Sequence, residues 1–178
     1  MTALFLYLLE EGNRGYMYLY SERIKLTLLS EYQVRLLLND RATFFDYFQI
    51  PYEHLWPSYA IKISLPLYYE ALQSNDRPDF GPCMIQLVET NHIIGEFNIR
   101  KRNTTVEIGY HIFPSYRNKG YATEAVAIFC EYIQHEPTIN RIIACCKINS
   151  TISQHILQKN DFHITMNEGI IKIYERLC

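Results

Sequence analysis

The stretch from Thr105 to Ile133 constrains the fold more than any other part of the chain. Its first eight residues alternate polar and apolar side chains, which predicts a half-buried strand. Pro114 ends that strand, because proline has no backbone N–H to donate to a central ladder. A basic turn follows, and from Ala122 onwards apolar residues recur at helical spacing with no breaker before Pro137. This order places the backbone amides of the turn at the start of a helix.

That basic turn has the features of an anion-binding site. The first N–H groups of a helix have no intrahelical partner and carry a partial positive charge, so phosphate oxygens bind well there. Gly120 lets the backbone approach an anion closely, and Arg117 and Lys119 add positive charge beside it. A helix that merely follows a basic turn is the competing interpretation. The order of strand, proline, loop and helix is more restrictive than a glycine turn alone.

The turn resembles the pyrophosphate loop of the GCN5-related N-acetyltransferases, whose pattern is Arg/Gln-x-x-Gly-x-Gly/Ala. The longer segment 107–125 is similar to the RimJ/RimL type of ribosomal-protein acetyltransferase within that family. The resemblance extends from about Ser21 to the C-terminus and is specific from about Ile93 to Phe162. The residues that would bind the coenzyme diphosphate are those of the loop: Arg117, Asn118, Lys119, Gly120, Tyr121 and Ala122.

The fold class that the resemblance implies is α/β (α+β), with a mixed, mostly antiparallel central sheet of six or seven strands flanked by helices. The strand before the loop and the strand after the loop helix are expected to be parallel, because a helix crossover joins them. In this family these two strands splay apart at the cofactor site. The splay would free backbone groups near Ile112 and Phe113 to bind the pantetheine and the thioester carbonyl. Alternating or apolar segments predict strands at residues 23–29, 83–88, 93–100, 105–112, 140–148, 162–166 and 170–174.

A capping box predicts the first helix. Gln33 follows Ser30 by three residues, so each side chain can bond the backbone N–H of the other. The helix is expected to end near Asp40. Its inward face is expected to carry three apolar residues, Val34, Leu37 and Leu38.

Two later helices and one irregular segment follow. Pro66 suits a first helical position, so a helix is expected from there to Ser74. Ser150 is expected to cap a short helix that ends at Lys159. Residues 44–59 are rich in aromatic side chains and show no clean period. By the resemblance this segment lies over the acceptor side of the site, and aromatic packing beneath a long loop is an equally good explanation.

Acetyl transfer requires a neutral amine and a hydrogen-bond partner for the departing thiolate. Glu107 is the candidate general base, directly or through water, with an ion-paired or solvated carboxylate as the alternative. By the resemblance, Ser153 matches a serine suggested as the partner of the thiolate; otherwise its hydroxyl bonds back to a helix carbonyl. Many family members use a tyrosine on the last helix for this step. Leu157 stands at that position here.

Acetyl-CoA is the co-substrate that the resemblance implies, and no metal is expected. Asn149 lies one position before the family's asparagine, whose place is taken by Ser150, and is expected to reach the pantetheine. Glu124 matches the glutamate after the loop and is expected to make a helix-dipole or structural contact. Asp161 replaces the usual glycine after the last helix, and aspartate tolerates the left-handed conformation needed there.

Composition and charge exclude several classes of protein. The 178 residues suit one domain, and a net charge of −2 gives no reason to expect nucleic acid or an anionic membrane as partner. The apolar run Leu4–Leu9 is too short to span a bilayer and lacks the features of a secretory signal. The five cysteines lack metal-ligand spacing and fit buried, reduced thiols in a cytoplasmic protein. Residues 1–16 are expected to lie outside the domain 17–178, with Met17 as an alternative start.

Together these features predict a cytoplasmic enzyme that moves an acetyl group from acetyl-CoA to a primary amine by direct attack in a ternary complex. The acceptor would be a protein N-terminal α-amine or a small-molecule amine. An α-amine, with a pKa of about 7.7–8.0, needs less help from a base than a lysine, with about 10.4. A non-catalytic acyl-CoA-binding sensor and the same fold with another acyl-CoA are the open alternatives. A homodimer is compatible with the family likeness.

Overall fold

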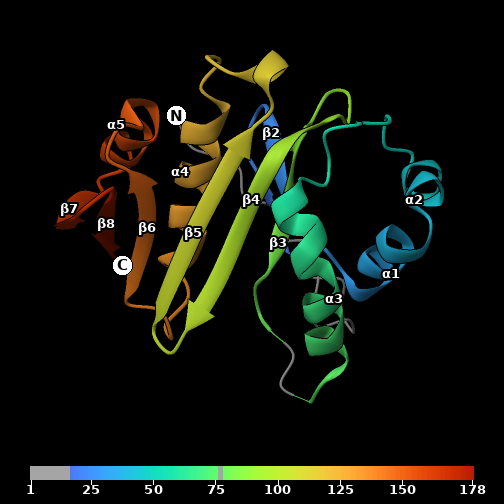
Figure 1. Cartoon of the computed structure of the whole chain (residues 1–178), viewed down its shortest axis with the longest axis horizontal. Helices are drawn as coiled ribbons and strands as arrows, with labels where there is room; N and C mark the ends of the chain where they lie inside the picture. Colours follow the sequence, from blue (N-terminus) through green and yellow to red (C-terminus); the bar gives the residue numbers. More distant parts are fainter. Residues whose placement is uncertain (1–16, 76–77) are drawn as a thin grey trace.

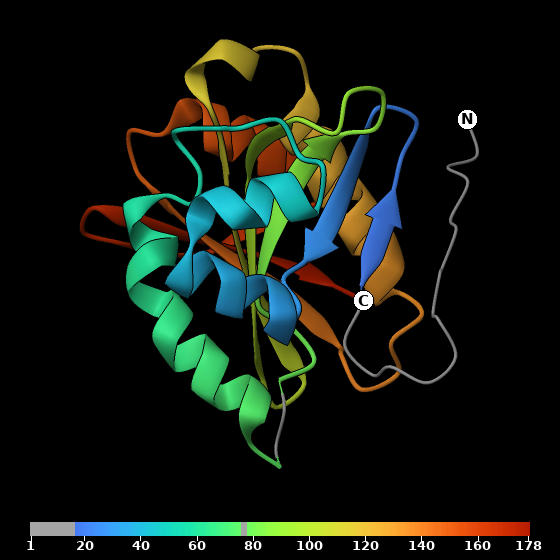
Figure 2. The same cartoon turned by 90° about the vertical axis from the view of Figure 1, so that its right-hand side faces the viewer.

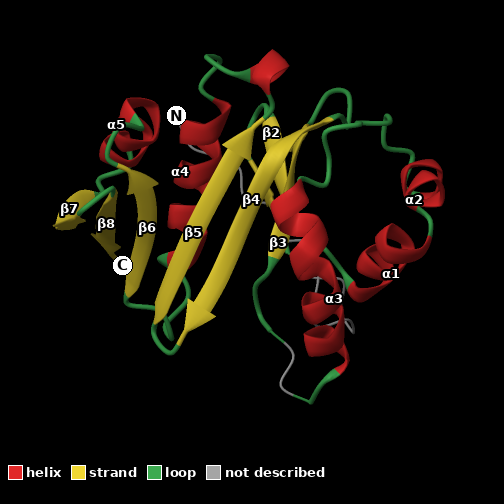
Figure 3. Cartoon of the chain, viewed as in Figure 1, coloured by secondary structure: helices red, strands yellow, loops and turns green. Residues whose placement is uncertain are grey.

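The computed structural model describes residues 17–75 and 78–178, which build one mixed sheet with helices on both faces (Figures 1 and 3). The sheet has eight strands in the order β1-β2-β3-β4-β5-β6-β8-β7, and every neighbouring pair is antiparallel except β5 and β6. The predicted fold class is therefore confirmed. The strands are β1 (Tyr18–Tyr20), β2 (Ile24–Leu28), β3 (Pro82–Leu87), β4 (Ile93–Arg102), β5 (Thr105–Ile112), β6 (Arg141–Lys147), β7 (His163–Glu168) and β8 (Ile171–Leu177).

The sheet has one strand more than expected. The additional strand, β1, pairs with β2 over only three residues, which is too short for an alternating pattern to be recognised in the sequence. The expected extension, residues 1–16, lies outside the described part of the chain.

The helices form a layer on each side of the sheet. The helices are α1 (Glu31–Asn39), α2 (Arg41–Tyr47) and α3 (Tyr59–Gln73) on the first side, α4 (Tyr121–Ile133) on the second, and α5 (Thr151–Lys159) next to β6. Figure 2 looks onto the side on which α1, α2 and α3 lie in front of the strands, with α4 behind them. Phe44 and Trp56 are at the centre of the apolar cluster under the first three, and Phe97 and Phe129 are at the centre of the other.

The parallel strands β5 and β6 pair over four residues and then part. The paired residues are Thr105–Ile108 and Arg141–Ala144, although β5 continues to Ile112 and β6 to Lys147. In Figure 1 the two strands diverge towards the end of the sheet at which α4 begins. The expected splay is thus present in the fold.

Helix α3 begins seven residues earlier than predicted. Ser58 is its N-cap, with Oγ accepting from the N–H of Ile61 at 3.4 Å, and Pro66 lies inside the helix rather than at its start. Proline removes one helical hydrogen bond. Leu65 before the proline and Leu72 after it are both buried in the apolar cluster, so tertiary packing overrides the local preference.

The capping box of α1 is confirmed. The backbone N–H of Ser30 donates to Gln33 Oε1 at 2.9 Å, and the N–H of Gln33 donates to Ser30 Oγ at 3.2 Å. The expected inward face is correct only for Val34, because Leu37 is half-buried and Leu38 is exposed. The helix is short and packs on one side against α2 and α3, so only a narrow stripe is covered.

The aromatic segment before α3 is part core and part surface. Phe44, Phe45 and Trp56 are buried and contact one another, with the rings of Phe44 and Trp56 5.2 Å apart. Tyr52 and Tyr59 are exposed. Packing beneath the loop accounts for the first group, and the exposed tyrosines remain candidates for contact with an acceptor.

We expect Gly95→Ala to destabilise the protein by about 1–3 kcal/mol, because overpacking forces the backbone to move. A Cβ on Gly95, in β4, would lie 2.3 Å from the carbonyl oxygen of His111 in β5. Urea unfolding measures the change. Gly109→Ala is the matched control, since a Cβ there meets no atom within 4 Å. Equal midpoints for the two variants would contradict the close approach.

Candidate coenzyme-binding and active site

The predicted pyrophosphate loop ends in the N-terminus of α4. Gly120 is the N-cap and has a left-handed φ of +83°, which favours glycine. The first intrahelical bond runs from the N–H of Glu124 to the carbonyl of Gly120, at 3.0 Å. The N–H groups of Tyr121, Ala122 and Thr123 therefore have no partner within the helix. These amides, with the helix dipole behind them, have the arrangement that an anion site requires, and the prediction that they bind the coenzyme diphosphate stays a prediction.

The two basic residues of the loop differ in their surroundings. Arg117 turns back to the end of β5, where its Nε donates to the carbonyl of Ile112 at 2.9 Å and its NH2 lies 3.0 Å from His111 Nε2. Lys119 is exposed, with Nζ 5.7 Å from the centre of the Tyr116 ring. Lys119 is thus the loop cation that remains available to an incoming anion, whereas Arg117 holds the strand end.

The backbone groups of β5 that face the splay belong to Ile112 and Tyr110. The N–H of Phe113 donates to the carbonyl of Ile94 in β4 at 2.9 Å, so Phe113 faces away from the splay. Backbone groups point to alternate sides along a strand. Those of Ile112 and Tyr110 therefore point towards β6, where pairing has already stopped after Ile108.

Tyr110 links β5 to α5 across the splay. Its hydroxyl donates to the carbonyl of Ser153 at 3.3 Å, and burial raises the pKa of the phenol so that it stays protonated. Ser153 Oγ accepts from Ser150 Oγ at 2.9 Å. The structure therefore brings Ser153 to the splay, beside Tyr110, a residue that the sequence presented only as one of the apolar positions of the strand.

Leu157, at the place of the family's usual tyrosine, is buried in the core and offers no polar group. Asn149 is exposed in the turn after β6, at the open end of the splay. Asp161 has a φ of +63°, as expected for the residue after the last helix. Lys159 is exposed in the final turn of α5.

Glu107 lies on the opposite face of β5 from Tyr110, next to the point at which the splay begins. Its Oε2 is 3.9 Å from Arg100 NH1, and about a third of its side chain is exposed. The ion pair expected as an alternative role is therefore present, in a loose and solvated geometry that leaves the carboxylate accessible.

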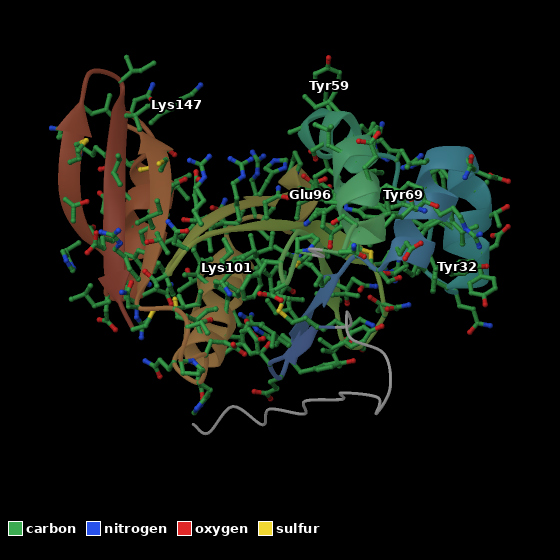
Figure 4. The ribbon with its side chains drawn as sticks, turned by 90° about the horizontal axis from the view of Figure 1, so that it is seen from below. Tyr32, Tyr59, Tyr69, Glu96, Lys101 and Lys147 are labelled. Atoms are coloured by element: carbon green, nitrogen blue, oxygen red, sulfur yellow. The ribbon has the colours of Figure 1, made fainter. Side chains whose placement is uncertain are left out.

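A second carboxylate on this face was not singled out from the sequence. Glu96 in β4 stands directly opposite His111 and is buried, and its Oε1 accepts from the N–H of Ser58 at 2.5 Å. Figure 4 shows Glu96 next to α3, with Lys147 on the far side of the sheet face. An isolated glutamate within an alternating strand gives no signal that it will be buried.

No helix of residues 17–75 or 78–178 covers the sheet face between α3 and β8. Its residues on β4, β5 and β6 point away from α4 and are exposed; they include Asn98, Arg100, Gly109, His111 and Cys145. The splay therefore opens onto two sides, the anion site at the start of α4 and this exposed face.

The five cysteines are all unpaired, but their burial differs from the expectation. Cys83 and Cys130 are buried, and burial raises the pKa of the Cys130 thiol to about 12. Cys145 and Cys178 are exposed and Cys146 is half-buried, so the account of five buried thiols is wrong for three of them. Cys145 and Cys146 face opposite sides of β6, as the strand period requires.

Within the described ranges no three His, Cys, Asp or Glu side chains lie close enough together to hold a metal ion. Over the same residues, no helix has the length and apolar character needed to cross a membrane.

A family model for the acetyltransferase (GNAT) domain matches residues 34–163. The chain belongs to the GNAT acetyltransferase family. Among individual proteins, an uncharacterized N-acetyltransferase of Bacillus subtilis, YnaD, is 42% identical over 55 residues. That match covers 31% of this chain and 32% of the relative, so the matched part spans about a third of the length of YnaD.

Two solved GNAT structures share the fold at low sequence identity. One is RimL, the ribosomal L7/L12 α-N-protein acetyltransferase, in complex with coenzyme A, with a TM-score of 0.62, 15% identity and coverage of 90% of this chain and 98% of RimL. The other is the microcin C7 self-immunity acetyltransferase MccE in complex with acetyl-CoA and AMP, with a TM-score of 0.60, 18% identity and coverage of 89% and 94%.

Proposed function

We propose that this protein transfers an acetyl group from acetyl-CoA to a primary amine by direct attack of the amine in a ternary complex. The observation that carries the proposal is the position of the β5–β6 splay, which starts after Ile108 and opens beside the unpaired amides of α4. A diphosphate site and a gap lined by strand backbone are thereby joined. Coenzyme complexes of RimL and MccE, which have this fold, support the choice of ligand.

In this proposal the coenzyme is held mainly by backbone groups. The amides of the loop 117–122 and of the first turn of α4 bind the diphosphate, and Lys119 adds charge. The backbone of Ile112 and Tyr110 bonds the pantetheine and polarises the thioester carbonyl, as an oxyanion hole does. Asn149 contacts the pantetheine from the side of β6. When bound, acetyl-CoA supplies the activated acyl group.

Two side chains are proposed to act in the chemical step. Glu107 accepts a proton from the amine, directly or through a water molecule, as the new C–N bond forms and the C–S bond breaks. Ser153 donates a hydrogen bond to the departing thiolate, and the protonated Tyr110 hydroxyl lies beside it. Glu107 thus accepts the proton that the amine loses, and Ser153 stabilises the negative charge that forms on sulfur.

The acceptor that we favour is a protein N-terminal α-amine. RimL acts on the α-amine of a ribosomal protein. An α-amine has a pKa of about 7.7–8.0 and is partly neutral at pH 7, so a solvated carboxylate such as Glu107 suffices as its base. The uncovered sheet face offers room for a polypeptide end, and a small-molecule amine remains the alternative. Five unpaired thiols fit a cytoplasmic location.

Thermal melting with acetyl-CoA, CoA and longer acyl-CoAs tests the first step. At a ligand concentration of about 100 Kd the gain in stability is about 2.7 kcal/mol, a shift of several degrees in Tm. We expect acetyl-CoA to give such a shift, and a longer acyl-CoA to give a larger one only if it is the true donor. A protein whose Tm responds to no CoA species would contradict the proposal.

Thiol release across a panel of amines tests the second step. Peptides with a free N-terminus are compared with the same peptides blocked at that end, and with small amines. Release that depends on the free α-amine supports the proposal. A Tm shift without release for any amine would favour a non-catalytic acyl-CoA sensor, the alternative to which the missing tyrosine at Leu157 points.

A further inference from the structure

The turn between β1 and β2 lies against the start of α4, and one arginine of that turn reaches into the coenzyme loop. Arg23 NH1 donates to the carbonyl of Lys119 at 3.0 Å, and its Nε donates to Glu124 Oε2 at 2.8 Å. The guanidinium also stands 4.9 Å from the centre of the Tyr121 ring. Figure 2 shows this turn, in blue, next to α4. A residue about a hundred positions away in sequence therefore touches the loop on both sides of Gly120.

Glu124 is held from two directions. Besides Arg23, the hydroxyl of Ser21 donates to Glu124 Oε1 at 2.5 Å. The side chain of Glu124 is largely buried, whereas about half of the Arg23 side chain is exposed. The carboxylate is thus fixed in one orientation by two groups of the same turn.

The position of Glu124 creates an electrostatic conflict with the proposed ligand. A carboxylate in the first turn of a helix is stabilised by the helix dipole. It also competes with any other anion for the positive N-terminus of that helix. A diphosphate bound at the α4 amides would lie close to Glu124, and like charges repel strongly where solvent is excluded. Neutralisation of this carboxylate is therefore a condition for tight coenzyme binding.

We propose that Arg23 is a positioning residue for the coenzyme loop, an inference that rests on the proposed function. Its guanidinium neutralises Glu124 and, through the Lys119 carbonyl, keeps the amides of Gly120 and the residues after it turned towards the diphosphate. About half of the Arg23 side chain is exposed, so solvent screens the pair and its contribution to stability alone is small. A guanidinium can donate to Glu124 and to the Lys119 carbonyl at the same time, because its N–H groups point in several directions in one plane. The single ammonium of a lysine is less suited to this pair of contacts.

The test uses the binding of CoA alone, without an acceptor, measured by calorimetry. We expect Arg23→Gln to raise the Kd for CoA at least tenfold and to leave kcat at saturating acetyl-CoA within about threefold. Arg23→Lys keeps the positive charge but lacks the several N–H donors of the guanidinium. We therefore expect its loss of CoA affinity to be smaller than that of Arg23→Gln. The deficit of Arg23→Gln shrinks as salt is added, because salt screens the repulsion between Glu124 and the diphosphate.

A double variant tests whether the charge of Glu124 causes the loss of CoA affinity in Arg23→Gln. In Arg23→Gln/Glu124→Gln the repelling carboxylate is gone, so we expect most of the lost affinity to return. The matched control is Arg35→Gln on α1, which removes an arginine of similar environment, its Cζ 5.0 Å from the Tyr32 ring and far from the loop. That control is expected to keep the wild-type Kd.

The outcomes for Arg23 and for the enzyme are distinct. Equal Kd values for wild type and Arg23→Gln would overturn the role of Arg23. No recovery in the double variant would overturn the neutralisation of Glu124 as the cause of the lost affinity. CoA binding that depends on Arg23 as described, together with no thiol release for any amine, would overturn the acetyltransferase proposal and leave the role of Arg23 in place. Should Arg23→Gln fold poorly by circular dichroism, the comparison of Arg23→Lys with wild type decides.

Discussion

Gly120→Glu is expected to abolish the binding of acetyl-CoA while the protein stays folded. The new side chain would put a carboxylate on the N-cap of α4, where the diphosphate is proposed to bind, and a φ of +83° is unfavourable for it. The backbone strain is about 1–2 kcal/mol, a fraction of the stability of a typical domain. The Kd measured by calorimetry should rise more than a hundredfold, or binding should become undetectable.

Gly169→Glu is the matched control for this change. Gly169 lies in the turn between β7 and β8, has a φ of +57°, and a Cβ there meets no atom within 4 Å. Both variants place a glutamate at a positive φ, so they carry the same charge and a comparable backbone conformation at different places. If Gly120→Glu binds acetyl-CoA as tightly as Gly169→Glu does, the loop 117–122 is not the diphosphate site.

Glu107→Gln is expected to lower kcat by a factor of about 10²–10⁴, the usual contribution of a positioned general base. Binding of acetyl-CoA should be unchanged, because Glu107 lies on the sheet face away from α4 and outside the loop. Steady-state kinetics with a saturating acceptor give kcat, and calorimetry gives the Kd. The reduction should be smaller for acceptors of low pKa, which need less help to lose a proton.

The ion pair of Glu107 with Arg100 provides the control. Arg100→Gln removes the partner at 3.9 Å but keeps the carboxylate. We expect this variant to retain most of the activity. Equal and small losses in Glu107→Gln and Arg100→Gln would identify Glu107 as a structural ion-pair residue and assign the base elsewhere, with buried Glu96 the next carboxylate on that face.

Much of the fold could be predicted because it depends on local patterns. The capping box of Ser30 and Gln33, the strand before Pro114 and the left-handed residue Asp161 each need only neighbouring residues. The parallel pairing of β5 and β6 follows from the helix crossover that joins them, the splay is implied by the family resemblance, and the pairing over four residues confirms both. The helix predicted from Pro66 failed because packing on the core outweighs one lost hydrogen bond.

The contacts that complete the candidate site join residues far apart in the chain. Arg23 contacts the loop from the turn between β1 and β2, and Tyr110 contacts Ser153 across 43 positions. No local pattern marks such pairs, because they arise only when the sheet has assembled. Arg117 contacts Ile112 and His111, which are only five and six positions away. The sequence predicts its charge near the loop, but the direction of the guanidinium depends on where the end of β5 lies.

The short pairing of β5 with β6 has a consequence for the whole scaffold. Four residue pairs are the only ladder in the described structure between the half-sheet β1–β5 and the half-sheet β6, β8 and β7. A chain-like molecule in the gap, with amides of its own, would serve as the missing strand between them. The bound coenzyme would then connect the two half-sheets. Each cycle of binding and release would form and break the contacts across the gap between β5 and β6.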